Sequence, residues 1–90
     1  MIRHYNITVT GRVQGVFYRA STREKARELG VTGFVKNQRN GSVYMEAEGT
    51  TEQLDALVDW CRQGPPQSVV EKVHVENGDV IGFDQFRIKH

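Results

Sequence analysis

Residues 11–19, GRVQGVFYR, combine two glycines with two arginines and contain no acidic side chain. Glycine backbone can curl around an oxyanion and offer it amide N–H groups. The planar guanidinium of Arg19 can hold two oxygens of one phosphate. These residue types favour a phosphate-binding loop, although a tight turn followed by a solvated arginine also fits them. The stretch has neither the spacing of a Walker loop nor that of a dinucleotide-binding glycine motif.

A second segment able to do chemistry is residues 33–41, GFVKNQRNG. Side chains of a strand alternate between its two faces, so Asn37 would share a face with Val35. Its carboxamide has one acceptor and two donors, which suits it to holding a water molecule in a chosen direction. An asparagine that simply ends a strand before a turn is the alternative interpretation.

The positive charge near these segments is local. The chain carries a formal net charge of only +1, whereas a domain that binds nucleic-acid phosphates is expected to be strongly basic. We therefore expect a site for a small anion and no nucleic-acid partner. The other basic residues in or near the two segments are expected to be solvated surface charges, and the alternative is that they add to the field that draws anions in: Arg12, Arg23, Lys36 and Arg39.

The sequence predicts neither a metal site nor a disulfide. Cys61 is the only cysteine, and His4, His74 and His90 are far apart in sequence, so no metal-ligand spacing is present. We expect the histidines to lie on the surface and Cys61 to be a buried small hydrophobic residue. The chain has no apolar run of about 18 residues and no signal-peptide core, which predicts a cytoplasmic protein without a membrane partner.

Hydrophobic periodicity predicts the elements that would position the first segment. Apolar and polar side chains alternate over residues 4–11, as in a half-buried strand. Residues 11–17 would form a loop, and a helix would begin near Tyr18 and stop at Gly30. The first N–H groups of a helix have no intrahelical partner and its dipole favours anions there, which places Arg19 beside an anion site. The buried side of the helix is predicted at Tyr18, Thr22, Ala26 and Leu29.

The remaining elements follow from the same rules. Further strands are predicted at residues 31–38, 42–49, 68–78 and 86–90. Asn40 and Gly41 are the pair that a type I′ hairpin turn prefers. A second helix would begin with the capping-box sequence of residues 50–53 and end before Gly64, with Trp60 at the edge of the core. Its buried side is predicted at Leu54, Leu57, Val58 and Cys61.

The order β-α-β-β-α-β predicts an α+β fold of the ferredoxin-like class, in which an antiparallel sheet carries both helices on one face. Ninety residues support one core, so we expect a single domain over residues 1–90. No exposed apolar stripe calls for a partner, which predicts a monomer. RNA-recognition domains share this fold, but residues 33–41 lack their aromatic signature.

GRVQGVFYR followed at this distance by GFVKNQRNG resembles the two motifs of the acylphosphatase family. The likeness extends over nearly the whole chain. Members of the family are small ferredoxin-like enzymes that hydrolyse the carboxyl-phosphate bond of acyl phosphates. The resemblance implies a small-molecule acyl phosphate as substrate, with no metal and no other cofactor.

The resemblance also assigns roles at matching positions. Arg19 ends the first motif and would be the catalytic residue that binds phosphate, and Asn37 of the second motif would orient the attacking water. Tyr18 stands where a phenylalanine is common, and its ring is expected to point into the core. Backbone amides of five consecutive residues would assist in binding the phosphate: Gln14, Gly15, Val16, Phe17 and Tyr18.

Such a site offers no histidine, cysteine or pair of carboxylates for acid–base work, and the substrate explains why none is needed. The leaving group is a carboxylate whose conjugate acid has a pKa of about 4, by analogy with Asp and Glu side chains, so it departs without a general acid. The tasks that remain are orienting water and stabilising charge on the phosphoryl oxygens. A small-anion-binding module without turnover is the alternative function.

Overall fold

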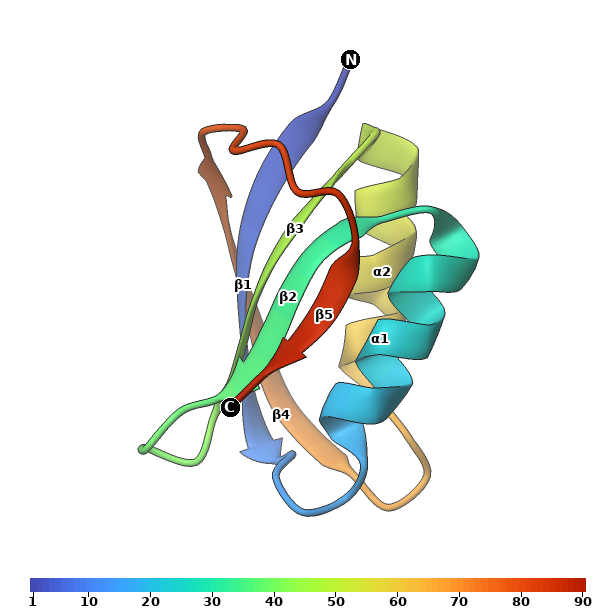
Figure 1. The fold of residues 1–90 in the computed structure, drawn as a ribbon. Coiled ribbons are helices and arrows are strands. Elements are labelled where there is room, and N and C mark those ends of the chain that lie inside the picture. The colour runs from blue at the N-terminus through green and yellow to red at the C-terminus, as the bar shows by residue number, and fades with distance from the viewer.

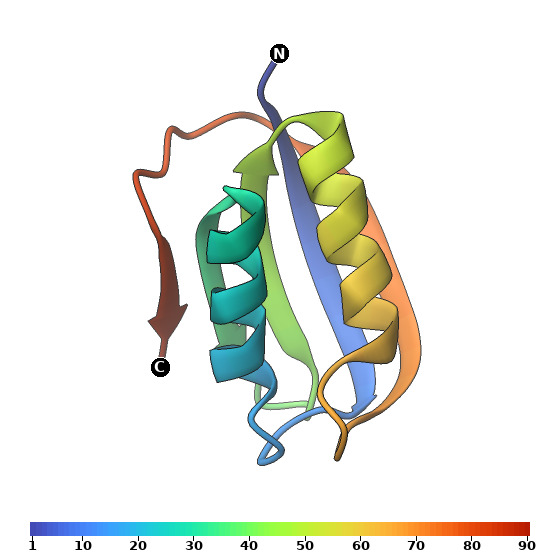
Figure 2. The ribbon, with the colours of Figure 1, turned by 90° about the vertical axis from the view of Figure 1, so that its right-hand side faces the viewer.

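The computed structural model describes all 90 residues of the chain and contains five strands and two helices (Figure 1). In chain order they are β1 (Arg3–Arg12), α1 (Tyr18–Leu29), β2 (Thr32–Asn37), β3 (Val43–Gly49), α2 (Thr51–Gln63), β4 (Val69–Gly78) and β5 (Phe86–Lys89). The strands form one sheet in the order β4-β1-β3-β2-β5, and both helices lie on the same face of it (Figure 2). The predicted α+β, ferredoxin-like class is confirmed.

The last strand makes the sheet mixed. The pairs β4-β1, β1-β3 and β3-β2 are antiparallel, whereas β5 runs parallel to β2. Helix α1 runs antiparallel to β2 and β5, so its first turn lies at the same end of the molecule as the C-terminal ends of these two strands (Figure 1). The fold therefore gathers three chain segments that are distant in sequence around the start of α1.

The core lies between the sheet and the two helices and is a single cluster of 16 buried hydrophobic residues. Tyr18 is only 1 % exposed, and its hydroxyl donates a hydrogen bond of 2.8 Å to the carbonyl oxygen of Cys61. Its ring packs against Trp60, which is partly buried as predicted. These contacts fix the first turn of α1 on the last turn of α2. The predicted buried positions are confirmed at Leu54, Leu57, Val58 and Cys61 in α2 and at Tyr18, Thr22 and Ala26 in α1. Leu29, the last predicted position of α1, is only partly buried.

The hairpin turn between β2 and β3 differs from the prediction. A type I′ turn needs positive φ at two successive residues, but only Gly41, with φ of 91°, has it there. The turn is closed by the bonds from the Gly41 N–H to the Gln38 carbonyl (3.2 Å) and from the Gln38 N–H to the Ser42 carbonyl (2.9 Å). Asn40 instead accepts hydrogen bonds from the backbone and hydroxyl of Ser42 through its side chain. That side-chain bond stabilises a turn without left-handed backbone at Asn40.

The expectation that all three histidines lie on the surface is wrong for His4, which is only 3 % exposed. The neighbouring Tyr5 bonds to Asp55 of α2, so the alternation of strand side chains directs His4 to the face of the sheet opposite the helices. Residues 79–85 cross that face between β4 and β5 (Figure 1). The ring of Phe83, from this connection, stacks on His4 at a centroid distance of 6.0 Å. A strand pattern alone does not show that a later loop covers its outer face.

Neither helix combines the length and the apolar character that crossing a membrane requires.

Candidate active site

A cavity of about 620 Å³ opens where the first turn of α1 meets the ends of β2 and β5. The sequence-predicted residues Arg19 and Asn37 both line it, although 18 positions separate them in the chain. Four of the lining side chains are arginines and none is an aspartate or a glutamate. The cavity is therefore strongly electropositive.

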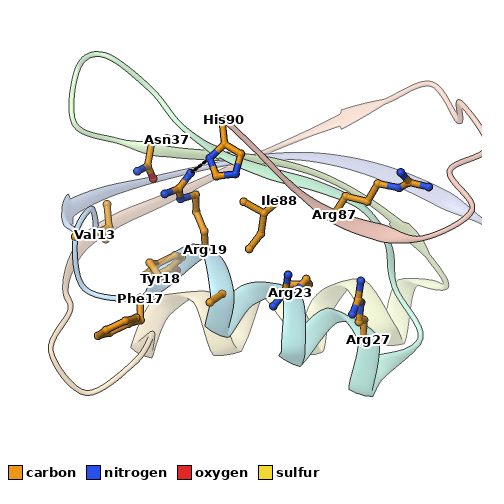
Figure 3. Close-up of a pocket in the computed structure, with 12 residues that line it drawn as sticks. Val13, Phe17, Tyr18, Arg19, Arg23, Arg27, Asn37, Arg87, Ile88 and His90 are labelled. Atoms are coloured by element: carbon orange, nitrogen blue, oxygen red, sulfur yellow. Dashed lines mark hydrogen bonds between the residues drawn. The ribbon is translucent and has the colours of Figure 1, made fainter.

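The side chains of Arg19 and Asn37 lie near one another at the mouth of this cavity (Figure 3). The Arg19 Nη1 atom lies 3.3 Å from Nδ1 of His90 and donates a long bond of 3.5 Å to the Lys89 carbonyl. The Asn37 Oδ1 atom is buried and has no hydrogen-bond partner within the protein. Both groups thus have polar atoms available for a bound molecule.

The loop before α1 presents a run of unused backbone donors. No backbone N–H from Gln14 to Tyr18 donates a hydrogen bond within the protein. Gly15 and Phe17 have left-handed backbone, with φ of 74° and 64°. Left-handed residues in such a loop turn successive N–H groups toward one concave surface, which is a favourable arrangement for an anion.

The first turn of α1 adds to this donor set. Phe17 is the N-cap residue and makes no side-chain capping bond, and the first turn contains no acidic residue. The partial positive charge of the helix start is therefore not neutralised by the protein. Arg19 lies within the same turn, so a guanidinium and several amides surround one place.

Gln14 has a role that the sequence did not indicate. Its Nε2 atom donates to the carbonyl oxygens of Gln38 (2.7 Å) and Ser42 (2.9 Å). These bonds tie the loop to the hairpin turn that directly follows Asn37. No sequence signal connects Gln14 with carbonyls 24 and 28 positions away, so only the folded chain reveals this link between the two motifs.

Gly11 is not part of the loop, contrary to expectation, because β1 continues to Arg12. It lies at an irregularity of the β1–β4 pairing and has φ of 121°. A Cβ atom there would lie 2.2 Å from the carbonyl oxygen of Val69. Gly11 is therefore required by the close approach of β4, and its backbone takes no direct part in the cavity.

Arg23 also departs from its expected role as a solvated surface charge. It lines the cavity, its Nε atom is buried, and this atom has no hydrogen-bond partner within the protein. The helical pattern of α1 places Arg23 on the polar side, but β5 packs along that side and covers it (Figure 3). The position of a strand more than 60 residues away is not visible in that pattern.

Two buried titratable groups near the start of α1, Tyr18 and Cys61, do not supply an acid or a base. Burial, together with the hydrogen bond to Cys61, raises the pKa of Tyr18 far above its usual range, so the hydroxyl stays protonated. Burial raises the pKa of the Cys61 thiol to about 12, which makes it unreactive near neutral pH. These two residues leave binding, charge stabilisation and positioning of water to the site. The expectation of a site without histidine is wrong, because His90 lines the cavity with Nδ1 3.3 Å from Arg19.

Comparison with known proteins identifies relatives over nearly the whole chain. The sequence model named Acylphosphatase matches residues 5–88. An acylphosphatase of Marinobacter nauticus is 47% identical over 90 residues, which cover 99% of this chain and 98% of that protein. The structure of an acylphosphatase from Coxiella burnetii superposes with a TM-score of 0.95 at 41% identity, covering 98% of this chain and 93% of the other. The crystal structure of acylphosphatase from Bacillus subtilis gives a TM-score of 0.95 at 34% identity, with both chains fully covered.

Proposed function

The chain belongs to the acylphosphatase family and hydrolyses acyl phosphates, and from this premise we propose how its residues perform the reaction. Arg19 and the amides of residues 14–18 bind the phosphoryl group, and Asn37 orients the attacking water. No metal takes part. The observation that carries the proposal is that three residues with unused amides, Gly15, Phe17 and Tyr18, line one cavity together with Arg19 and Asn37. The other two predicted amide donors, Gln14 and Val16, belong to the same loop but do not line the cavity.

Binding of the phosphoryl group rests on two kinds of donor. The N–H groups of Gln14 to Tyr18 have no acceptor in the protein, so a phosphoryl oxygen satisfies donors that are otherwise unpaired. The Arg19 guanidinium adds a full positive charge and leaves its weak contacts with His90 and Lys89 for stronger, charge-assisted bonds. A charge pair at about 4 Å is worth about 4 kcal/mol at an effective dielectric constant of about 20.

The attacking water is oriented by Asn37. Its buried Oδ1 atom accepts a hydrogen bond from the water and thereby turns a lone pair of the water oxygen toward phosphorus. The new P–O bond forms as the bond from phosphorus to the acyl oxygen breaks. The carboxylate departs with the bonding electron pair, and the proton of the water passes to a phosphoryl oxygen of the substrate.

Independence from metal follows from the same chemistry. The leaving carboxylate is a weak base, with a conjugate acid of pKa about 4, and needs neither a proton nor a Lewis acid to depart. The charge that develops on the phosphoryl oxygens faces Arg19 and the loop amides, which are already oriented before the reaction. A divalent cation has no carboxylate side chain to bind among the residues that line the cavity.

The test is hydrolysis of benzoyl phosphate in excess chelator by the wild type and by two variants. Arg19→Gln is expected to lower kcat/KM about 1,000-fold, the equivalent of the 4 kcal/mol charge pair. Asn37→Ala is expected to lower kcat about 100-fold or more while the inhibition constant of inorganic phosphate stays nearly unchanged, because its role is with the water. Arg19→Gln should weaken phosphate inhibition as well.

The matched controls are Arg3→Gln and Asn77→Ala, which remove the same groups from exposed positions at the other end of the sheet. Both should keep wild-type kinetics. An Asn37→Ala enzyme with unchanged kcat would overturn the role of Asn37. A folded wild type that binds phosphate but turns over nothing in chelator, and regains activity with Mg²⁺, would contradict metal independence.

A further inference from the structure

The electropositive cavity continues beyond the phosphate site along α1. Arg19, Arg23 and Arg27 are spaced four residues apart, so they lie on one side of the helix at intervals of about 6 Å. All three line the cavity, and Figure 3 shows their side chains rising from α1 toward β5. Ala20 of α1 and Ile88 of β5 add apolar surface to the cavity. The cavity thus has a phosphate-binding end at Arg19 and continues along α1 past the positive charges of Arg23 and Arg27.

Arg23 differs from the other arginines of the continuation in having no partner. Arg27 donates from Nη2 to the Phe86 carbonyl at 3.2 Å. Arg87 faces Asp84 at 3.9 Å. Arg23 makes no hydrogen bond or ion pair in the protein, and its Nε atom is buried. A buried guanidinium donor without an acceptor is unfavourable unless a ligand supplies one.

The carboxylates of the same helix do not serve this purpose. Glu24 and Glu28 are exposed, and Glu28 pairs with Lys25 at 3.5 Å. Neither glutamate lines the cavity. No carboxylate of the helix therefore pairs with Arg23, and its guanidinium is free to bind an anionic group of a molecule in the cavity.

We propose that Arg23 is a specificity-determining residue that binds a second anionic group, carried on the acyl part of the substrate. The preferred substrates are acyl phosphates with a carboxylate or phosphate placed about one helical turn from the reacting phosphoryl group, which Arg19 holds. The apolar carbon skeleton between the two anionic groups lies against Ala20 and Ile88. This inference rests on the proposed function of Arg19.

The experiment compares two substrates of equal reactive geometry, benzoyl phosphate and 4-carboxybenzoyl phosphate, which differ by one carboxylate at the far end of a rigid ring. The quantity measured is the ratio of their kcat/KM values. In Arg23→Gln the preference for 4-carboxybenzoyl phosphate is expected to fall about tenfold or more, mainly through KM, because a charge-assisted hydrogen bond to the ground state and the transition state is lost. Arg23→Lys should restore part of the preference.

Arg3→Gln is the matched control, because it removes the same charge from an exposed site outside the cavity, and it should leave the ratio at the wild-type value. An unchanged ratio in Arg23→Gln overturns the inference, and so does an equal loss for both substrates, which would assign Arg23 to the phosphoryl group. If the folded wild type hydrolyses neither substrate, the proposed function itself fails. Thermal unfolding of each variant separates these results from loss of fold.

Discussion

Two loops at opposite ends of the sheet each contain consecutive backbone N–H groups outside the helix and sheet pairing, and the loops differ in what these groups bind. The N–H groups of Ile81, Gly82 and Phe83 donate to the carboxylate of Glu48 at 2.6, 3.0 and 3.2 Å. The N–H groups from Gln14 to Tyr18 meet no acceptor of the protein. In residues 81–83 the protein supplies its own anion, Glu48, and we call this the filled loop. Residues 14–18 of the proposed active site have no such partner, and we call this the open loop.

The starts of the two helices repeat this difference. Thr50 caps α2 by accepting from the Gln53 N–H, and the Gln53 side chain accepts from the Thr50 N–H, as the sequence predicted. The start of α1 has no side-chain cap. An anion that binds to the loop before α1 therefore accepts hydrogen bonds that no group of the protein accepts.

The largest loss of activity is expected when the open loop receives a carboxylate of its own. Gly15 lines the cavity, and a Cβ atom there has no neighbour within 4 Å. Gly15→Asp is therefore expected to fold, since Asp tolerates left-handed backbone, and to oppose the substrate phosphate. A like charge at about 5 Å is worth about 3 kcal/mol at a dielectric constant of about 20, or a loss of about 100-fold in kcat/KM.

Gly15→Asn is the control for this first prediction, because it has the same shape and the same tolerance of positive φ without the charge. Its kcat/KM should exceed that of Gly15→Asp by the same factor of about 100. Equal losses in the two variants would mean that the backbone of the loop, and not its electrostatic potential, is what the aspartate disturbs.

The opposite change removes the charge from the filled loop. Glu48 is 3 % exposed and bonds to three amides and to His4. Glu48→Gln is expected to lower the free energy of unfolding by about 2–3 kcal/mol, because a buried charge and several donors lose their partner, while kcat/KM of the folded enzyme changes little. Urea denaturation measures the loss. Glu46→Gln, which alters a more exposed carboxylate 3.2 Å from His4, should cost clearly less.

A smaller effect is expected at the start of α2. Thr50→Ala removes the hydroxyl that accepts from the Gln53 N–H at 3.2 Å and should lower the free energy of unfolding by about 1 kcal/mol, with unchanged kcat/KM. Thr51→Ala, at the exposed neighbouring residue, is the control and should have almost no effect. A loss of activity in Thr50→Ala at constant stability would show that the two helix starts are coupled.

The open loop could be predicted from the sequence, whereas the filled loop could not. The strands and helices follow from local periodicity and capping, and they lie within a few residues of their predicted bounds. The glycines and the arginine at the predicted helix start indicated the loop before α1, because the groups that would bind an anion there are consecutive in sequence. The filled loop depends on Glu48, which lies more than 30 residues from the amides that it binds, and no local pattern predicts that contact.

The same distinction explains the site residues that sequence reasoning missed. The bonds of the Gln14 side chain, the burial of the Arg23 Nε atom and the burial of His4 all depend on elements distant in the chain. The assignment of Gly11 to the loop failed for the same reason, since the approach of β4 to β1 determines its backbone. Local chemistry was predictable, and contacts between distant segments were not.

The smallest effect expected is the dependence of stability on pH, which the pair of Glu48 and His4 controls. Burial alone would lower the pKa of His4, but its ring nitrogens face Glu48, Asn6 and Glu46, and together these raise it above 6.5. Burial alone would raise the pKa of Glu48, but bonds from three amides and His4 lower it below 4.5. The stability that His4 contributes is therefore fully present below about pH 6.5 and is lost as the pH rises through its raised pKa. The stability that Glu48 contributes is present above about pH 4.5 and is lost as the pH falls through its lowered pKa.

Urea denaturation at pH 6, 7, 8 and 9 measures the alkaline side of this window. The wild type should lose stability across the series, and His4→Gln, which keeps a donor for Glu48 but does not titrate, should lose less. Other titrating groups act equally in both proteins and cancel in the difference. Parallel curves would mean that folding does not raise the pKa of His4. Glu48 would then be held by its three amides and a neutral imidazole, with no positive charge beside it.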